Sequence, residues 1–266
     1  MITIPTFVVV LFVIWLFMIA PKNKKEMKRF KTKMYAHRGL HNSERAENSM
    51  SAFKAAVDGG YGIELDIRLS KDGQLVVFHD DTLDRVCGRE GKVIDFTAEE
   101  LATFKLNGTD DGVPLFSDVL KMVDGRVPLL VEIKEHPGVS AVSEAACIML
   151  DSYKGDFIVE SFNPLSLKIV KDRKPEIVRG ILSQRYCEDE KYRKPLYFIL
   201  QSLMLNFLCR PAFIAYDHRH AKSFALRFVR GFFDVPTIAW TVRSAEEEAV
   251  ARKNGYDGII FENYIP

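Results

Sequence analysis

The chain has 266 residues, enough for one large α/β domain or two small ones. Hydrophobic residues make up 47% and charged residues 27%, a composition that excludes a disordered chain. The formal net charge of +1 excludes the strongly basic surface that nucleic-acid binding requires, so we expect no nucleic-acid partner. The four cysteines form no Cys-x-x-Cys pair, and the sequence therefore supports neither a zinc site nor a disulfide framework.

The first twenty residues form an apolar segment. Between Ile2 and Ala20 the polar residues are Thr3 and Thr6. A run of about 18 or more apolar residues is long enough to span a bilayer as a helix. We therefore predict that residues 1–20 are a transmembrane anchor. The alternative is a cleaved signal peptide, which fits less well because no basic residue precedes the apolar run.

Residues 21–33 form a charged linker. Its basic residues are Lys22, Lys24, Lys25, Lys28, Arg29, Lys31 and Lys33. Because basic residues stay on the cytoplasmic side of a membrane protein, we expect a single-pass protein of the cell membrane whose main domain faces the cytoplasm. The same residues can lie against anionic lipid headgroups.

After residue 33, short β-rich runs alternate with helical segments, and no change in composition marks a second domain. Several of the runs are continuously apolar, which is typical of parallel strands buried on both faces. The expected strands are Met34–His37, Ile63–Leu69, Leu75–His79, Leu129–Lys134, Phe157–Ser161, Ile177–Leu182, Phe213–Tyr216, Thr237–Val242 and Gly258–Phe261. The expected helices are Ser49–Asp58, Ser117–Val123, Val139–Tyr153, Pro164–Arg173 and Ala245–Asn254. This alternation predicts an α/β fold, a TIM-type (β/α)8 barrel over residues 34–266, with an open doubly wound sheet as the alternative.

One pair of strands breaks the alternation. Ile63–Leu69 and Leu75–His79 are separated only by residues 70–74, which contain the hairpin sequence Asp72-Gly73. We therefore expect Leu75–His79 to run antiparallel to the second barrel strand, which leaves eight strands for the barrel. Residues 81–113 contain no clear barrel strand and are predicted to be a small insertion after the second strand.

Charged side chains occur in two strands that are otherwise apolar. Glu64 and Asp66 are two residues apart and point to the same face of their strand, as do Glu132 and Lys134. Buried carboxylates are costly unless they are paired or bound to a cation, and TIM barrels gather their active sites at the carboxyl ends of the strands. The predicted hairpin returns His79 to the two carboxylates of the second strand. The sequence therefore predicts one polar site at this end of the barrel.

A set of short motifs, in order along residues 34–261, resembles those of the glycerophosphodiester phosphodiesterase family. The motifs are His37-Arg38-Gly39, Glu47-Asn48-Ser49, Glu64-Leu65-Asp66, Asp72-Gly73, Val76-Val77-Phe78-His79-Asp80, Glu132-Ile133-Lys134, Ser161-Phe162-Asn163, Ala239-Trp240-Thr241-Val242 and Asp257-Gly258-Ile259-Ile260. Any one motif is unspecific, but the ordered set is specific. The sequence departs from the family at Phe261-Glu262-Asn263, where a Thr-Asp pair is usual after the last strand, and this departure affects local loop packing.

The resemblance implies a TIM barrel in which two histidines act as acid and base beside one divalent cation. Matched by motif, the histidines are His37 and His79, the metal ligands are Glu64, Asp66 and Glu132, and the phosphate- or substrate-binding residues are Arg38, Lys134 and Trp240. An all-carboxylate site suits a hard cation such as Ca2+ or Mg2+. The cation and the basic residues would neutralise the charge that grows on the phosphoryl oxygens.

Three classes of function follow from this resemblance. The first is metal-dependent hydrolysis of glycerophosphodiesters to sn-glycerol 3-phosphate and an alcohol. The second is a lysophospholipase D-type cleavage of lysophospholipids at the membrane, which the apolar N-terminus and the apolar stretch Pro195–Leu208 favour. That stretch is expected to be a barrel-packing helix, or else a helix that touches the membrane. The third is a non-catalytic binding module tethered to a membrane, which is disfavoured because both histidines and all three carboxylates are present.

Overall fold

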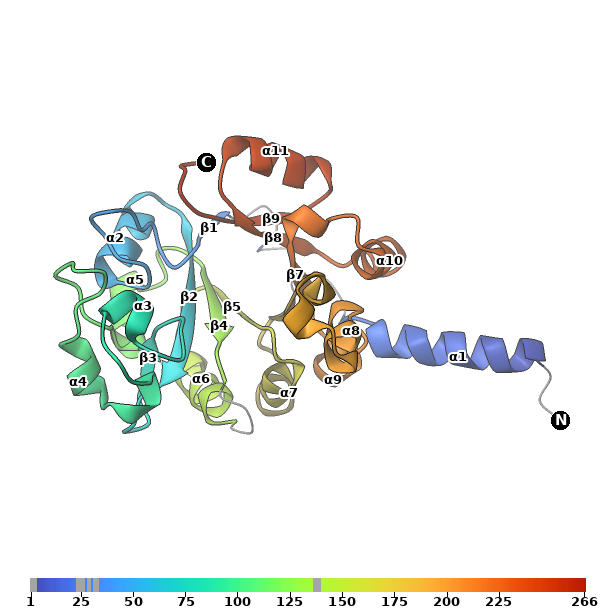
Figure 1. Cartoon of the computed structure of the whole chain (residues 1–266), viewed down its shortest axis with the longest axis horizontal. Coiled ribbons are helices and arrows are strands. Elements are labelled where there is room, and N and C mark those ends of the chain that lie inside the picture. The colour runs from blue at the N-terminus through green and yellow to red at the C-terminus, as the bar shows by residue number, and fades with distance from the viewer. Residues whose placement is uncertain (1–3, 23–26, 28–29, 31–33, 136–139) are drawn as a thin grey trace.

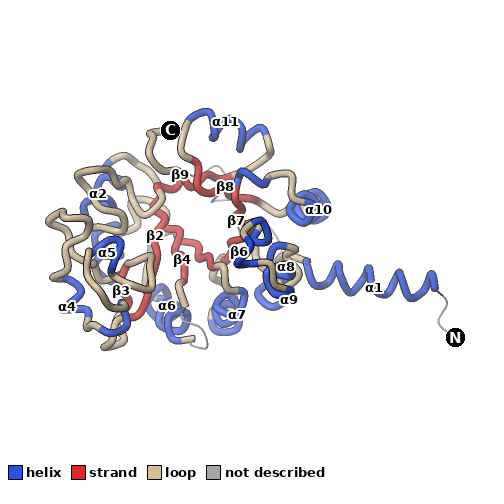
Figure 2. The backbone as a smooth tube through the Cα atoms, viewed as in Figure 1, coloured by secondary structure: helices blue, strands red, loops and turns tan. Residues whose placement is uncertain are grey.

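The computed structural model describes residues 4–22, 27, 30, 34–135 and 140–266 (Figures 1 and 2). Eight parallel strands form a closed barrel, because β1 pairs with both β2 and β9. The strands are β1 (Met34–Ala36), β2 (Gly62–Leu69), β4 (Leu129–Ile133), β5 (Phe157–Ser161), β6 (Arg179–Ser183), β7 (Phe213–Asp217), β8 (Thr237–Val242) and β9 (Gly258–Phe261). The predicted barrel is therefore confirmed, and the open sheet is excluded.

The remaining strand, β3 (Leu75–Val77), lies outside the barrel and pairs with β2 in the antiparallel direction. Ile67 lies opposite Val77 in this pair, and the turn contains Gly73 with a φ of 74°. A left-handed φ of this kind favours glycine, which explains the hairpin at Asp72-Gly73. The predicted excursion from the second strand is thus confirmed.

Helices surround the strands on the outside, as Figure 2 shows. They are α2 (Met50–Asp58), α5 (Phe116–Val123), α6 (Ala141–Asp151), α7 (Pro164–Arg173), α10 (Phe224–Phe233) and α11 (Ala245–Lys253). Ser49 and Ser244 cap α2 and α11, since their hydroxyls accept hydrogen bonds from backbone N–H groups three residues later. The start predicted for α6 at Val139 lies outside the described residues.

Alternation along the strands separates the barrel interior from the layer beneath the helices. In β4, Leu130 packs in the interior with Tyr35 and Phe213, whereas Leu129 and Val131 pack beneath the helices. Burying one such aliphatic side chain contributes about 1.5–3 kcal/mol. Glu132 follows Leu130 by two residues and therefore also faces the interior. The alternation carries the polar residues of β2 and β4 into the mouth of the barrel.

Residues 81–113, where an insertion was predicted, hold short helices and no barrel strand. The helices are α3 (Asp84–Cys87), η2 (Val93–Asp95) and α4 (Ala98–Ala102). They cover β3 and share a separate apolar cluster with it, which includes Val76, Phe78 and Leu101. Through this cluster, the segment packs against the outside of the barrel.

The N-terminal helix α1 (Ile4–Ile19) has 16 residues and corrects the prediction of a transmembrane span. Nowhere in the described part of the chain is a helix both long and apolar enough to cross a membrane. At about 1.5 Å per residue, α1 measures about 24 Å, against about 30 Å for the hydrocarbon core of a bilayer. The predicted linker, residues 21–33, lies largely outside the described residues.

The carboxyl end of α1 is fixed to the barrel. Asn206 donates a buried hydrogen bond to the carbonyl of Ile19 at 3.0 Å. The Arg210 guanidinium donates to the carbonyls of Phe17 and Ala20, each at 3.0 Å. These bonds satisfy carbonyls that the helix itself leaves unpaired. From this point α1 extends away from the barrel, as the blue helix in Figure 1 shows.

The apolar stretch Pro195–Leu208 is not one helix, as was expected, but two. The first is α8 (Pro195–Gln201) and the second is α9 (Asn206–Cys209). Leu203, between them, has a φ of 58°, which an α-helix does not accommodate. α9 lies under the end of α1, and the exposed side chains of α8 include Leu196 and Phe198.

Candidate active site

Three carboxylates meet at the carboxyl ends of β2 and β4. Glu64, Asp66 and Glu132 each offer an oxygen within 4.8 Å of the other two, and all three side chains are buried. The register of the parallel pair explains the meeting, because Asp66 lies directly opposite Glu132. The structure therefore brings together all three residues that the sequence predicted as metal ligands.

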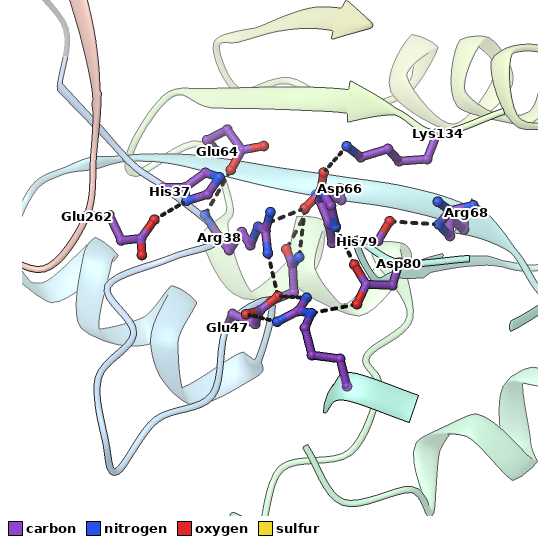
Figure 3. Close-up of polar contacts among 12 residues, drawn as sticks. His37, Arg38, Glu47, Glu64, Asp66, Arg68, His79, Asp80, Lys134 and Glu262 are labelled. Atoms are coloured by element: carbon purple, nitrogen blue, oxygen red, sulfur yellow. Dashed lines mark hydrogen bonds and ion pairs between the residues drawn. The ribbon is translucent and has the colours of Figure 1, made fainter. Parts of the chain in front are cut away.

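Polar neighbours hold each carboxylate in place, and Figure 3 shows those of Glu64 and Asp66. The backbone N–H of Arg38 donates to Glu64 at 2.8 Å, and the Asn48 amide donates to Asp66 at 2.9 Å. The Lys134 ammonium lies 2.7 Å from Glu132 and 3.2 Å from Asp66. Lys134, predicted to contact phosphate, thus faces the carboxylates and compensates part of their charge.

The electrostatics of the three carboxylates differ. Burial and the charge of Asp66 raise the pKa of Glu132 to about 7, although Lys134 opposes the shift. Burial and the two neighbouring carboxylates raise the pKa of Glu64 well above its usual value. Burial also acts to raise the pKa of Asp66, but Lys134, His79 and Arg38 hold it far below its usual value. Without a further cation, the group is therefore not fully ionised at neutral pH.

A divalent cation fits this arrangement. All three donors are carboxylate oxygens, which suit hard cations such as Ca2+ and Mg2+. Oδ1 of the buried Asp66 faces the Lys134 ammonium at 3.2 Å and, among the described residues, accepts no hydrogen bond. The added charge would allow Glu64 and Glu132 to ionise as well.

His37 follows β1 and is oriented by a carboxylate after the last strand. Its Nδ1 lies 2.8 Å from Oε2 of Glu262. Figure 3 marks this contact with a dashed line. Burial lowers the pKa of His37, and the hydrogen bond with Glu262 opposes this shift. The same bond lowers the pKa of Glu262 to about 2, so this carboxylate is ionised. With Nδ1 engaged, Nε2 is the nitrogen available to a substrate.

His79 follows β3 and is held in the same way. Its Nδ1 lies 2.6 Å from Oδ1 of the adjacent Asp80. Burial lowers the pKa of His79 to about 4, with the cations Lys134 and Arg38 contributing to the shift. The hairpin returns His79 to the carboxylate cluster, as the sequence predicted, and its charge acts on Asp66.

A chain of ion pairs links Arg38 to His79 through the segment 81–113. Arg38 donates to Glu47 at 2.6 Å, and Arg85 of α3 donates twice to the Glu47 carboxylate at 2.7 Å. Arg85 also donates to Asp80 at 2.7 Å. The sequence alone predicted no role for Glu47, Asp80, Arg85 or Glu262. Glu47 and Asp80 stood within quoted motifs, and Glu262 stood where the chain departs from the family.

A cavity of about 200 Å³, which we call the mouth cavity, lies at the carboxyl ends of the strands. The predicted residues on its wall are His37, Arg38, Glu64, His79, Glu132, Lys134 and Trp240. Phe162 and Leu182 add an apolar part, and the ring of Phe162 meets that of Trp240 edge to face at 5.4 Å. Trp240 therefore lines the cavity and does not simply fill the barrel.

Comparison with known proteins agrees with this arrangement. Residues 37–265 match the model of the glycerophosphoryl diester phosphodiesterase family. A glycerophosphodiester phosphodiesterase from Caldanaerobacter subterraneus is 37% identical over 166 residues, which cover 58% of this chain and 68% of that protein. The human lysophospholipase D GDPD1 is 28% identical over 198 residues, 69% of this chain and 56% of that protein.

A solved structure has the same fold. It is an Oleispira antarctica phosphodiesterase in complex with its product sn-glycerol 3-phosphate. The TM-score is 0.74 at 20% identity, and the match covers 88% of this chain and 94% of that one. The family match extends from His37 almost to the end of the chain and includes the whole mouth cavity. The chain thus belongs to the glycerophosphoryl diester phosphodiesterase family and is a phosphoric diester hydrolase.

Proposed function

We propose that this enzyme hydrolyses glycerophosphodiesters to sn-glycerol 3-phosphate and an alcohol with the help of one divalent cation, Ca2+ or Mg2+. The observation that carries the proposal is the mouth cavity, on which His37 and His79 both lie beside Glu64 and Glu132. Each imidazole is held through Nδ1 by a carboxylate, so both offer Nε2 to one substrate. The two imidazoles can thereby supply an acid and a base to the same phosphodiester.

The basic residues and the two histidines of the site have separate roles. Arg38 and Lys134 neutralise the phosphoryl oxygens. His79, whose pKa of about 4 leaves it neutral, accepts the proton of the attacking oxygen at Nε2. His37, whose pKa burial lowers while the ionised Glu262 opposes the shift, donates a proton from Nε2 to the leaving alkoxide. When bound to Glu64, Asp66 and Glu132, the cation supplies positive charge to the phosphoryl group.

The test measures release of glycerol 3-phosphate from glycerophosphocholine by the full chain, with Ca2+, with Mg2+ and with EDTA. We expect turnover with one or both cations, none with EDTA, and a loss of about 10²-fold or more in His37→Ala and His79→Ala. His220→Ala is the matched control, because His220 is not on the wall of the mouth cavity. Turnover that survives EDTA, or both histidine substitutions, would disprove the proposal.

Lysophospholipids are a second candidate substrate class, favoured by a row of aromatic rings. The row begins in the mouth cavity with Trp240 and Phe162. It continues from Phe162 to Tyr186 at 6.4 Å between ring centroids, and from Tyr186 to Tyr197 of α8 at 5.6 Å. Such a row places apolar surface next to the mouth cavity, and the human relative is a lysophospholipase D.

Competition between glycerophosphocholine and lysophosphatidylcholine distinguishes the two substrate classes. If lysophospholipids are substrates, Tyr197→Ser should raise KM for lysophosphatidylcholine and leave KM for glycerophosphocholine unchanged. Equal effects on both substrates would remove the support that the aromatic row gives to this candidate.

We also propose that the protein associates with the cell membrane through residues 1–20, with the barrel on the cytoplasmic side. Large apolar side chains of α1 are exposed from Phe7 to Ile14 and at Phe17, and Phe7, Val9 and Phe17 are each more than half exposed. A helix that is apolar all round requires an apolar environment. The basic residues between 22 and 33 support the cytoplasmic side, because the cytoplasmic leaflet carries anionic lipids.

Fractionation of cells that express the full chain tests this location. The protein should sediment with membranes and be protected from external protease in intact cells. Recovery in the soluble fraction would disprove the association, and digestion in intact cells would disprove only the orientation.

A further inference from the structure

A groove of about 620 Å³ lies outside the barrel, between α1, α8 and the start of α10. We call it the side groove. Its apolar wall contains Trp15, Phe198, Met204 and Phe224, and its cations are Arg185 and Lys222. We propose that the side groove binds one phospholipid with an anionic headgroup from the bilayer on which the protein sits, an inference that rests on the proposed membrane association.

The apolar wall is continuous with the exposed surface of α1. The ring of Trp15 lies 6.4 Å from that of Phe224 and 4.6 Å from that of Phe228. Phe224 is 73% exposed and Phe198 is 59% exposed, high values for aromatic side chains of a folded protein. An acyl chain in the groove would cover both rings and continue along α1 into the bilayer.

The cations complete the match to an anionic phospholipid. Arg185 and Lys222 are exposed, and the residues that line the side groove include no acidic residue. Arg185 pairs with Glu188 at 3.1 Å, but Glu188 also lies 2.6 Å from His220 and would keep that partner if Arg185 turned to a phosphate. Arginine and lysine beside an apolar wall suit a phosphate linked to acyl chains.

The groove lies near the carboxyl ends of the same strands that carry the mouth cavity. Leu182 of β6 lines the mouth cavity, and Arg185 follows β6 directly. Lys222 follows β7 after the short helix η5 (His218–His220). A phospholipid in the side groove would therefore bring the mouth cavity close to the membrane surface.

A second copy of the chain fits the groove less well. In a symmetric pair, the same surface patch faces itself, so Arg185 and Lys222 of one copy would lie near those of the other. The repulsion of these cations opposes such a contact, whereas an anionic headgroup removes it. A bilayer phospholipid satisfies both the apolar wall and the two cations.

The experiment uses the full chain with Trp240→Phe, which leaves Trp15 as its one tryptophan. The protein is mixed with phosphatidylcholine vesicles that contain a minor fraction of brominated phosphatidylcholine or of brominated phosphatidylglycerol. Bromine quenches tryptophan emission at contact, so the quenching of Trp15 reports the lipid in the side groove. Flotation of the same vesicles reports membrane association independently.

We expect brominated phosphatidylglycerol to be enriched at Trp15 by about fivefold for each cation that contacts the headgroup. Arg185→Glu with Lys222→Glu should abolish this preference and leave flotation intact. The matched control replaces Lys121 and Lys154, which line a different cavity between α5 and α6, with glutamate and should retain the preference. Circular dichroism verifies that both double variants are folded.

The outcomes separate this inference from the proposed location. Flotation with equal quenching by both lipids would overturn only the proposal that the side groove binds an anionic phospholipid. If the protein floats with neither kind of vesicle, both the membrane association and the binding of a phospholipid in the side groove are overturned. A dimer that buries Trp15 in the absence of lipid, detected by sedimentation, would assign the groove to a second copy of the chain and overturn the lipid.

Discussion

The Nδ1 atom of His37 lies 2.8 Å from Oε2 of Glu262, so residues separated by 225 positions share one hydrogen bond at the mouth of the barrel. β1 and β9 pair side by side, and this closure brings the two residues together. Glu262 has a second neighbour in Arg243, whose guanidinium lies 3.6 Å away. Glu262 is therefore positioned on both sides and in turn orients His37.

Glu262→Gln should lower kcat by about 10-fold or more, because His37 loses the charge that stabilises its protonated form. Glu262 opposes the lowering of the pKa of His37 by burial, so its removal lowers that pKa further. Because the proposed acid works only while protonated, the basic limb of the pH profile of kcat should move to lower pH. A full pH profile of both proteins checks this shift.

Glu262→Asp is the control for this prediction. It retains the charge but shortens the side chain, so the position of the basic limb should change less than in Glu262→Gln. An unchanged basic limb in Glu262→Gln would show that the carboxylate does not act through the protonation of His37.

Arg85→Ala should lower kcat/KM by about 10-fold and change thermal stability little. The guanidinium holds both Glu47 and Asp80, which in turn contact Arg38 and His79. Arg85 is 49% exposed, and ion pairs of exposed side chains contribute only about 0–1 kcal/mol to stability. Steady-state kinetics and thermal unfolding of the same samples check the two parts of the prediction.

Lys105→Ala is the matched substitution for Arg85→Ala. Lys105 lies in the same 81–113 segment and pairs only with Asp110 among the described residues, so kcat/KM should not change. Arg85→Lys should recover only part of the activity. Lysine keeps the positive charge, but it cannot bind a carboxylate through two nitrogens. A loss of kcat/KM in Arg85→Ala that follows a large loss of stability would contradict a positioning role.

The affinity for the divalent cation should rise with pH. Burial raises the pKa of Glu132 to about 7 and that of Glu64 above its usual value, so the cation must displace protons from these groups. Between about pH 6 and about pH 8, we expect Kd to fall by up to about tenfold per pH unit for each proton displaced. Calorimetric titration with Ca2+ and Mg2+ measures this dependence.

Glu160→Gln controls the cation measurement. Burial and the charges of Glu132 and Glu64 raise the pKa of Glu160 well above its usual value, which favours the neutral carboxyl group that the amide of glutamine replaces. Because Glu160 is outside the carboxylate triad, this variant should keep the affinity of the original protein. An affinity that does not vary with pH would mean that the triad is already ionised.

Gly180→Ala should destabilise the barrel by about 1–3 kcal/mol through overpacking. A Cβ atom on Gly180 in β6 would lie 2.2 Å from the ring of Phe213 in the barrel interior. Gly231→Ala in the exposed part of α10 is the opposite case, since a Cβ there meets nothing within 4 Å. This change should stabilise by up to about 1 kcal/mol, and urea unfolding of both variants checks the two signs.

Local patterns predicted the barrel closely. The strands β5, β8 and β9 were predicted with the same bounds as in the structure, and β9 is a continuous apolar run. A strand buried on both faces requires such a run, so composition alone reveals it. Glu64 and Asp66 were identified because buried charges in an apolar strand are costly unless they are paired or bound to a cation.

Features that depend on long-range contacts were missed. Glu262 orients His37 only because the barrel closes, and Arg85 reaches Glu47 only because α3 packs beside β3. The attachment of the end of α1 to the barrel was also missed, since Asn206 and Arg210 bind its last carbonyls. No local pattern reveals such partners, because they lie far away in the sequence.

The hydrogen bonds from Asn206 and Arg210 to the end of α1 have a consequence for the geometry of the whole protein. A helix joined to a domain by a flexible tether leaves that domain free to tumble. Here hydrogen bonds from Asn206 and Arg210 hold the end of α1 against the barrel, so the direction of α1 sets the tilt of the barrel. If α1 enters a bilayer as proposed, the height of the mouth cavity above the lipid surface is a fixed property of the fold. Shortening α1 by one turn would then change which phosphodiesters the enzyme can reach without altering a single residue of the mouth cavity.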